Sequence, residues 1–448
     1  MAKSIAIFGT SSDAGKSTIA LLIGKILQEL GYSVAPFKAQ NVSNNARVAD
    51  DGSEIAYSQY FQALALGVET SWHNNPVLLK SGYKNSTSLV VKGKALGSKD
   101  VRGYYRDLDR LKPAIKDALH HLQNEYEIII AEGAGSPVEL NLMEKDLSNI
   151  FTARATNAKI ILVADIEKGG VFASIYGVYN LLPKDLRDKV AGVIINKFRG
   201  DKTLFDDGIK IIEKEFGIPV FGVLPKLDWN LGFEDSLNLA NYRSSPKKKG
   251  SKRVAIISYP TMSNYNDFEP LIVDDEVELE FVRGDISLES FDLVILPGSK
   301  LVMRDLQWLK SSGLFERLKR REGKILGICG GYEMMFEKIL DPFEVESNLK
   351  EIKGLGFIDD VIFLNHKKVV KKDRYHIFGR FVDGFEIHNG ISQKYPLLFE
   401  DKNIQGTFVH ALFEDEKFKS YQKIEIEKFV FRLKESLDIK KIRQNLEI

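Results

Sequence analysis

The stretch Gly9-Thr10-Ser11-Ser12-Asp13-Ala14-Gly15-Lys16-Ser17-Thr18 decides the fold of the first part of this 448-residue chain. It follows an apolar run at residues 5–8, which is typical of a buried strand, and it precedes a helical pattern that ends at Gly31. A strand, a glycine-containing loop, Gly-Lys-Ser and a helix, in this order, are the context of a phosphate-binding loop. Five residues, instead of the usual four, separate Gly9 from Gly15, so the flanking strand and helix carry the prediction more than the spacing does.

The loop predicts binding of ATP with Mg²⁺. Backbone N–H groups and the helix N-terminus form a concavity for anionic oxygens, Lys16 can reach the β- and γ-phosphates, and the Ser17 hydroxyl can ligate the metal. Asn196 follows a later apolar strand, where its amide could read an adenine edge. The predicted nucleotide-binding residues are Gly9, Thr10, Asp13, Ala14, Gly15, Lys16, Ser17, Thr18 and Asn196. A chance glycine turn is the alternative.

Two acidic residues join Ser17 as predicted metal ligands. Glu132 ends the apolar strand 128–131 and precedes glycine, a place from which a carboxylate can bind Mg²⁺ or order its water. Glu54 stands before an alanine-rich helix, where it is either a metal or substrate residue or an acid of the first helical turn. For Glu132 the alternative is a plain Glu-Gly turn.

A polar run, Lys38-Ala39-Gln40-Asn41-Val42-Ser43-Asn44-Asn45, follows the second predicted strand. Ligand groups of α/β enzymes stand at the carboxyl ends of strands, and amide and ammonium groups recognise carboxylates and amides. We therefore predict substrate binding by Lys38, Gln40, Asn41 and Asn44. An asparagine-rich turn is the alternative interpretation.

Composition and charge narrow the class of protein. The formal net charge of +1 offers no overall field for nucleic acid or an anionic membrane, and no stretch approaches the roughly 20 apolar residues of a membrane span. The N-terminus runs straight into a strand, so we expect no signal peptide and a cytoplasmic protein with small-molecule substrates. One cysteine excludes an internal disulfide framework. The sequence leaves the oligomeric state open, a homo-oligomer included.

Strands alternate with helical segments in two series, which predicts an α/β protein with two doubly wound domains. The first domain is predicted at residues 1–240 and the second at 253–448, where a charged tail with helical spacing begins at 414. Residues 241–252 are polar and basic, and a solvated linker explains them better than a nucleic-acid-binding arm.

A second constellation surrounds the single cysteine. Cys329 lies between an apolar strand and a helix-like stretch, with glycines at 327, 330 and 331, which is typical of a sharp turn that presents a nucleophile. The helix N-terminus lowers a thiol pKa. The N–H groups of Gly298 and Gly330 are predicted oxyanion donors, and His410 is the predicted base. A buried structural cysteine is the alternative, and a role for His388 stays open.

These motifs carry a resemblance to known families. The Leu-Gly-Ile-Cys-Gly-Gly turn and the Gly-Thr-Phe-Val-His strand resemble the class I glutamine amidotransferases of the cobalamin-type branch, which implies a flavodoxin-like domain. The first half is similar to the dethiobiotin-synthetase type of P-loop domain, and the whole chain resembles the cobyric acid synthase family. Leu412 stands where many class I enzymes carry a glutamate that orients the histidine, so the orienting acid is not assigned; Glu386 and Asp267 are both open.

The resemblance implies an ATP- and glutamine-dependent ligase with a corrinoid acceptor. The expected reaction amidates the b, d, e and g carboxylates of adenosylcobyrinic acid a,c-diamide, with acyl-phosphate activation in the first domain and glutamine hydrolysis by Cys329 and His410 in the second. A cobyrinic acid a,c-diamide synthase is the close alternative, and an amidase of another acid is a second one. A P-loop partitioning or metallochaperone ATPase is the alternative from a different class.

Overall fold

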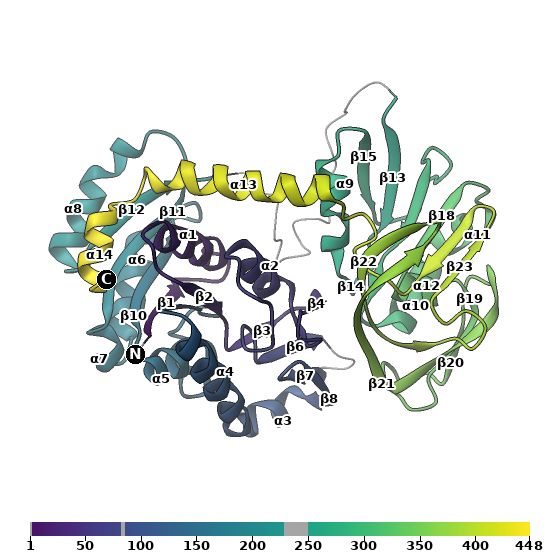
Figure 1. Ribbon diagram of the computed structural model, residues 1–448, viewed down its shortest axis with the longest axis horizontal. Helices are drawn as coiled ribbons and strands as arrows, with labels where there is room; N and C mark the ends of the chain where they lie inside the picture. Colours follow the sequence, from purple (N-terminus) through teal and green to yellow (C-terminus); the bar gives the residue numbers. More distant parts are fainter. Residues whose placement is uncertain (1, 82–85, 228–249) are drawn as a thin grey trace.

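The computed structural model describes residues 2–81, 86–227 and 250–448. It contains two α/β domains, each with a largely parallel six-stranded sheet, and so confirms the predicted fold class (Figure 1). Most of the predicted linker 241–252, and the last residues of the predicted first domain, lie outside the described residues. None of the described helices combines the length and the apolar character that crossing a membrane requires.

The first sheet is parallel throughout, in the order β12-β11-β10-β1-β9-β2. Its strands are almost continuously buried, as expected when helices cover both faces. The strands are β1 (Lys3–Gly9), β2 (Val34–Phe37), β9 (Ile128–Glu132), β10 (Lys159–Asp165), β11 (Val190–Phe198) and β12 (Val220–Pro225). The helices are α1 (Lys16–Glu29), α2 (Tyr57–Ala65), α3 (Val101–Arg106), α4 (Lys112–Glu125), α5 (Thr152–Thr156), α6 (Val171–Leu181), α7 (Lys184–Arg187) and α8 (Asp206–Glu215).

Strand β1 lies between β9 and β10, so the chain order reverses at the centre of this sheet. Parallel pairing aligns the carboxyl ends: Ile7 is opposite Glu132, and Gly9 is opposite Val163. Ligands of open α/β sheets bind outside the carboxyl ends of strands at such a switch point. The topology therefore puts the phosphate-binding loop and Glu132 at one edge.

Smaller sheets extend the first domain toward the second. They consist of β3 (Gln40–Val42), β6 (Val77–Ser81), β7 (Ser86–Val91) and β8 (Lys94–Asp100) in one sheet, and β4 (Ala46–Val48) with β5 (Glu54–Ala56) in another. Side chains from β4, β5 and β22 of the second domain share one apolar cluster, which includes Ala46, Ala56 and Phe385. The two domains are thus packed together through this region.

The second domain has a sheet in the order β15-β13-β16-β18-β24-β23, in which only the β23–β24 pair is antiparallel. Its strands are β13 (Lys252–Ile257), β15 (Val277–Val282), β16 (Leu293–Leu296), β18 (Lys324–Ile328), β23 (Leu398–Asp401) and β24 (Ile404–Thr407). Further strands are β14 (Met262–Ser263), β17 (Gly298–Ser299), β19 (Phe336–Leu340), β20 (Glu351–Lys353), β21 (Ile358–Ile377) and β22 (Arg380–Ile391). The helices are α9 (Glu269–Val273), α10 (Val302–Ser311), α11 (Leu314–Arg320) and α12 (Gly330–Glu333).

The C-terminal tail returns to the first domain. Helix α13 (Glu416–Lys434) runs from the second domain to the first, and α14 (Ile439–Leu446) ends there, so both termini lie in the first domain (Figure 1). Apolar residues of both helices, among them Phe429 and Ile442, belong to the core that α1 and β1 build. The predicted helix at the tail is present, but its apolar side chains complete the first core rather than the second.

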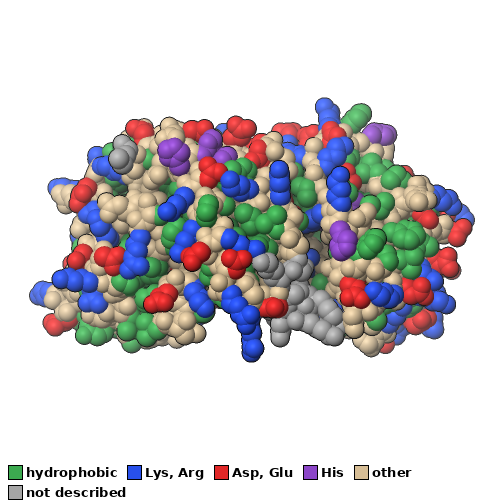
Figure 2. Space-filling model, turned by 90° about the horizontal axis from the view of Figure 1, so that it is seen from below, with side chains coloured by type: hydrophobic (Ala, Val, Ile, Leu, Met, Phe, Trp, Pro, Cys, Tyr) green, Lys and Arg blue, Asp and Glu red, His purple; other side chains and the backbone are tan. Residues whose placement is uncertain are grey.

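Charged side chains of both signs are interspersed over the face drawn in Figure 2, in keeping with the net charge of +1.

Candidate active sites in both domains

Residues at the ends of neighbouring strands make hydrogen bonds to the phosphate-binding loop. Gly15 has a φ of 95°, and a Cβ there would lie 2.2 Å from Asn196 Nδ2, so only glycine fits. Asn196 Nδ2 donates to the Ala14 carbonyl at 2.9 Å, and the Thr10 N–H donates to the Val163 carbonyl at 2.9 Å. The amide of Asn196 therefore contacts the loop, and its predicted contact with the adenine base stays a prediction.

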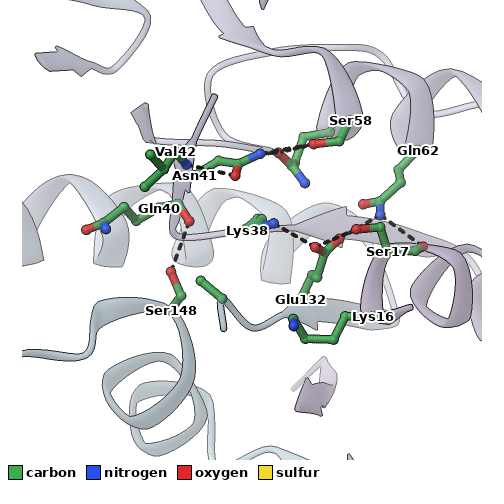
Figure 3. A network of polar contacts seen from close by, with 12 residues as sticks. Lys16, Ser17, Lys38, Gln40, Asn41, Val42, Ser58, Gln62, Glu132 and Ser148 are labelled. Carbon is green, nitrogen blue, oxygen red and sulfur yellow. Dashed lines mark hydrogen bonds and ion pairs between the residues drawn. The ribbon is translucent and has the colours of Figure 1, made fainter. Parts of the chain in front are cut away.

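The carboxylate of Glu132 accepts hydrogen bonds from three side chains near the phosphate-binding loop (Figure 3). Its Oε1 accepts from Ser17 Oγ at 2.8 Å and from Lys38 Nζ at 2.7 Å, and its Oε2 accepts from Gln62 Nε2 at 2.8 Å. Glu132 is 1% exposed. Lys16 lies beside this group and donates to the Ser11 carbonyl at 3.2 Å. The structure thus brings together Lys16, Ser17 and Glu132, as the sequence predicted.

The donor set near Ser17 suits Mg²⁺. A hydroxyl and a carboxylate are hard oxygen ligands, and Mg²⁺ in phosphate sites is held by one or two such groups together with phosphate oxygens and water. Gln62 Oε1 is buried and has no hydrogen-bond partner in the described part of the chain, which leaves one more oxygen beside Glu132 for a metal-bound water. The residues therefore fit the metal that a P-loop implies.

Glu54 does not join this group. It is fully buried in an ion pair with Lys80 of β6, at 2.5 Å between Nζ and Oε1, and with Lys368 of β21, at 2.7 Å. Burial pushes the pKa of Glu54 up, but the two lysines pull it down to about 2. The residue predicted as a metal ligand is thus a carboxylate that ties the two domains together, because its partners come from both.

The asparagine-rich segment runs from the phosphate site to the second domain. Lys38 contacts Glu132, as described, whereas Asn41 Nδ2 donates inside the domain to Ser58 Oγ at 3.0 Å and Gln59 Oε1 at 2.8 Å (Figure 3). Gln40 accepts a hydrogen bond from Ser148 at its carbonyl. Asn44 lines a hollow next to Cys329. The four predicted substrate-binding residues are therefore spread between two centres.

Cys329 occupies a strained turn between β18 and α12. Its φ of 51° and ψ of −112° are unfavourable for a residue with a Cβ, and such strain concentrates where a nucleophile is presented. A Cβ at Gly331 would lie 1.9 Å from the Leu296 carbonyl oxygen. The glycine is thus required for the turn. The thiol is 6% exposed and lies 3.5 Å from the Ile387 carbonyl oxygen.

His410 and Asp267 complete the arrangement around the thiol. His410 Nδ1 is 2.6 Å from Asp267 Oδ2, and Asp267 Oδ1 accepts from the Ala411 N–H at 3.1 Å. Although burial lowers the pKa of His410, its charge interactions and hydrogen bonds with Asp267 and Cys329 raise it to about 10. Phe385 stacks on the imidazole with ring centroids 4.9 Å apart. Asp267, one of the two acids that the sequence left open, is the one that contacts the histidine.

The other acid and the second histidine pair with each other. Glu386 Oε2 is 3.1 Å from His388 Nε2, and Glu386 Oε1 accepts from the Tyr375 hydroxyl at 2.9 Å. His388 Nδ1 contacts the Gly390 carbonyl at 2.8 Å, and its ring stacks on Phe408. Both nitrogens of His388 are thus engaged in the wall of the site.

The predicted oxyanion turn lies against the cysteine turn. A Cβ on Gly330 would lie 2.7 Å from Ser299 N, and one on Gly298 would lie 3.4 Å from His410 Cε1. Asp305 fixes this turn, because its Oδ2 accepts from Ser299 Oγ at 2.6 Å and from Thr261 Oγ1 at 2.7 Å. Burial raises the pKa of Asp305 to about 6. The backbone N–H of Ser299, which belongs to the same predicted turn as Gly298, is a candidate donor together with those of Gly298 and Gly330.

A hollow of about 40 Å³ adjoins Cys329 and is lined by residues of both domains. Asn44 and Lys80 come from the first domain, and Lys300 and Glu333 from the second. Burial raises the pKa of Glu333 well above its usual value, and its Oε2 has no partner among the described residues. Cations and acids therefore share a site that can recognise a zwitterionic amino acid.

Two family models match this chain, one in each of its two α/β domains. Residues 5–229 match the model of the CobQ/CobB/MinD/ParA nucleotide binding domain, and residues 253–418 match that of the CobB/CobQ-like glutamine amidotransferase domain. The chain is 61% identical over 418 residues to a cobyric acid synthase of Acinetobacter baylyi, covering 93% of this chain and 90% of that protein. It is 40% identical to a probable cobyric acid synthase of Picrophilus torridus, covering 94% and 92%, and 38% identical to a cobyric acid synthase of Listeria monocytogenes, covering 93% and 87%.

Proposed function

Because the chain belongs to the cobyric acid synthase family, and is thus a glutamine-dependent ligase of cobalamin biosynthesis, we propose that it amidates the b, d, e and g carboxylates of adenosylcobyrinic acid a,c-diamide. The observation that carries the proposal is the presence, in one chain, of a phosphate site around Ser17 and Glu132 and a Cys329–His410–Asp267 arrangement. One site would activate the acid and the other would supply nitrogen.

The first site would make the carboxylate reactive. A carboxylate oxygen attacks the γ-phosphorus of ATP, the bond from that phosphorus to the β,γ-bridging oxygen breaks, and ADP and an acyl phosphate form. Lys16 and the loop N–H groups would bind the phosphate oxygens whose charge grows during transfer. Ser17 and Glu132 would hold Mg²⁺, which, when bound, neutralises charge on those oxygens. Ammonia then attacks the acyl carbon and inorganic phosphate leaves.

The second site would release that ammonia from glutamine. Cys329 Sγ attacks the side-chain amide carbon while His410 takes the thiol proton and returns it to the departing nitrogen. The N–H groups of Gly330, Gly298 and Ser299 would stabilise the oxyanion. Water then hydrolyses the glutamyl thioester to glutamate and regenerates the thiol. Asp267 would hold the proton on Nδ1, so that Nε2 faces the sulfur as a base.

The corrinoid would bind between these centres. Lys38 at the phosphate site and Asn44 at the cysteine hollow mark the two ends of the segment we assign to the acceptor. Gln40 and Asn41 are the intervening residues of this segment. The Gln40 carbonyl accepts from Ser148, and the Asn41 side chain donates to Ser58 and Gln59. The continuity of the segment supports an acceptor site close to both the activated acid and the nitrogen source.

The test is an assay of the purified chain with ATP, the a,c-diamide and either glutamine or ammonium, followed by mass spectrometry of the corrinoid. We expect four successive amidations. Cys329→Ala should abolish the reaction with glutamine and retain it with ammonium, since only nitrogen release uses the thiol. Loss of both activities in a folded variant contradicts the two-site division. Turnover of cobyrinic acid in place of its a,c-diamide would support the a,c-diamide synthase instead.

A further inference from the structure

A cavity of about 640 Å³ lies between the two domains, under the returning helix α13. Phe61 and Leu64 of α2, Phe385 of β22 and Ile426 of α13 form parts of its wall. Sites for small molecules have volumes of roughly 300–1,000 Å³ and combine apolar and aromatic walls with a few polar groups. The cavity has the size and lining of such a site, and neither step of the proposed reaction uses it.

Arg47 contributes a buried positive charge to the wall of this cavity. Its side chain is 6% exposed, and its Nη2 forms an ion pair with Glu414. The guanidinium carbon lies 4.8 Å from the ring centroid of Phe385 and 5.2 Å from that of Tyr60. Glu414, Phe385 and Tyr60 all line the cavity together with Arg47. The surroundings of the guanidinium are therefore the cavity wall itself.

The guanidinium of Arg47 also has unused hydrogen-bonding capacity. Its Nε and Nη1 are buried, and neither has a hydrogen-bond partner in the part of the chain that the structure describes. Glu414 accepts from Nη2 and leaves these two nitrogens without an acceptor. Because a buried donor without an acceptor is costly, an acceptor atom supplied from the cavity would stabilise this arrangement.

Two lysines add to the positive charge at the cavity. Lys25 of α1 and Lys423 of α13 both line it. Burial and the like charge of Lys423 lower the pKa of Lys25, although Glu427 acts in the opposite direction. A negative charge near the two ammonium groups would favour their charged forms. The cavity therefore offers cations on its wall and apolar surface inside it.

We propose that this cavity is a binding site for a small aromatic carboxylate. The carboxylate accepts hydrogen bonds from Arg47, because charged donors and a carboxylate form the stronger class of hydrogen bond. The ring packs against Phe61, Leu64 and Ile426, where its apolar surface leaves water.

The proposed site is separate from both reaction centres. On α2, Gln62 donates to Glu132 at the phosphate site, whereas Tyr60 and Leu64 lie on the other face of the helix and line the cavity. None of the described residues lines both this cavity and the hollow beside Cys329. A ligand bound here would therefore leave the phosphate site and the thiol accessible.

The test is a calorimetric titration of the purified chain with 2-naphthoate and with 2-naphthol, which share one ring system but differ in charge at pH 7. We expect the carboxylate to bind about 10- to 100-fold more tightly, as a hydrogen bond to a charged group implies. Arg47→Lys keeps the charge and the partner Glu414 but has fewer donors in a different geometry. It should weaken binding of 2-naphthoate about 10-fold and leave that of 2-naphthol unchanged.

A second variant locates the binding in the cavity. Leu64 is 52% exposed and lines the cavity, so Leu64→Trp should fold and fill part of the space, weakening the binding of both compounds about 10-fold or more. Leu204→Trp is the matched control, because Leu204 is 83% exposed and is not part of the wall; binding should be as in the unchanged chain. Cooperative unfolding in urea reports that each variant is folded.

Three results would overturn the inference. The first is equal affinity for the two compounds, or no binding of either at millimolar concentration, in the unchanged chain. The second is undiminished binding of 2-naphthoate in folded Leu64→Trp, which would put the compound elsewhere. The third is displacement of 2-naphthoate by the corrinoid a,c-diamide, which would make the cavity part of the acceptor site. None of these measurements depends on turnover, so they leave the proposed function to its own test.

Discussion

Replacing Asp267 by asparagine is the sharpest test of the second site. The carboxylate accepts two hydrogen bonds, one from His410 Nδ1 at 2.6 Å and one from the Ala411 N–H at 3.1 Å. An amide offers only one acceptor atom at these two places. If its oxygen faces the histidine, the buried Ala411 N–H meets an NH₂ group; if its NH₂ faces the histidine, the proton moves to Nε2 and the base is lost.

The structure allows the loss to be estimated. A hydrogen bond to a charged group contributes about 1.5–3 kcal/mol. Since about 1.4 kcal/mol corresponds to a factor of ten in rate, Asp267→Asn should lower kcat/KM for glutamine by about 10- to 150-fold. The pKa of His410 should fall as well, because Asp267 is the first of the groups that raise it.

The assay compares glutamine with ammonium as the nitrogen source in one preparation. Amidation with ammonium should be unchanged, because the first domain does not use His410. Glu386→Gln is the matched control, because Glu386 contacts His388 and Tyr375 rather than His410. This substitution should lower kcat/KM for glutamine less than Asp267→Asn does. A glutamine-dependent rate in Asp267→Asn equal to that of the unchanged chain would refute the assignment of Asp267 as the orienting acid.

Further predictions concern the phosphate site, the interface and pH. Glu132→Gln should reduce amidation with both nitrogen sources while glutamine hydrolysis without acceptor persists, as glutamate release would report. Glu54→Gln leaves the buried Lys80 and the partly buried Lys368 without their counter-ion and should lower the free energy of unfolding, measured in urea, by about 3–5 kcal/mol. The pKa of His410 is raised in the folded state from 6.5 to about 10. Its contribution to stability is therefore complete below pH 6.5 and is lost as pH rises through 10. Over this pH window, the free energy of unfolding measured in urea should decline less in Asp267→Asn than in the unchanged chain.

The local sequence was sufficient to predict those parts of the two sites that are formed by consecutive residues. The loop from Gly9 to Thr18 and the turn at Cys329 each combine a strand end, glycines and a helix start, and the structure has strand, turn and helix at both places. These elements are predictable because the required backbone conformations, such as the φ of 95° at Gly15, restrict which residue can stand there.

Partners distant along the chain could not be predicted in this way. Asp267 is 143 residues from His410, and the motif that contains it gives no sign of which histidine it meets. Gln62 lies in an ordinary helical pattern, and only the packing of α2 against the loop brings it to Glu132. Glu54 was assigned from its place before a helix, but burial with lysines from two domains decides its role. Long-range pairing is a property of the tertiary fold.

The contacts between the domains explain why the two chemistries share one chain. Charged and polar groups of the first domain pair with the second at Arg47 with Glu414, Asp50 with Lys372, Glu54 with Lys368 and Tyr57 with Glu269. All four first-domain residues lie within eleven positions of the Ala46 N–H that contacts Asn264. Buried ion pairs add little net stability but strongly disfavour misaligned arrangements, because any shift leaves a charge unpaired. Arg47 with Glu414 and Glu54 with Lys368 are the largely buried ion pairs of this set, whereas Asp50 and Lys372 meet at the surface. The two buried pairs therefore set the register in which the two domains meet.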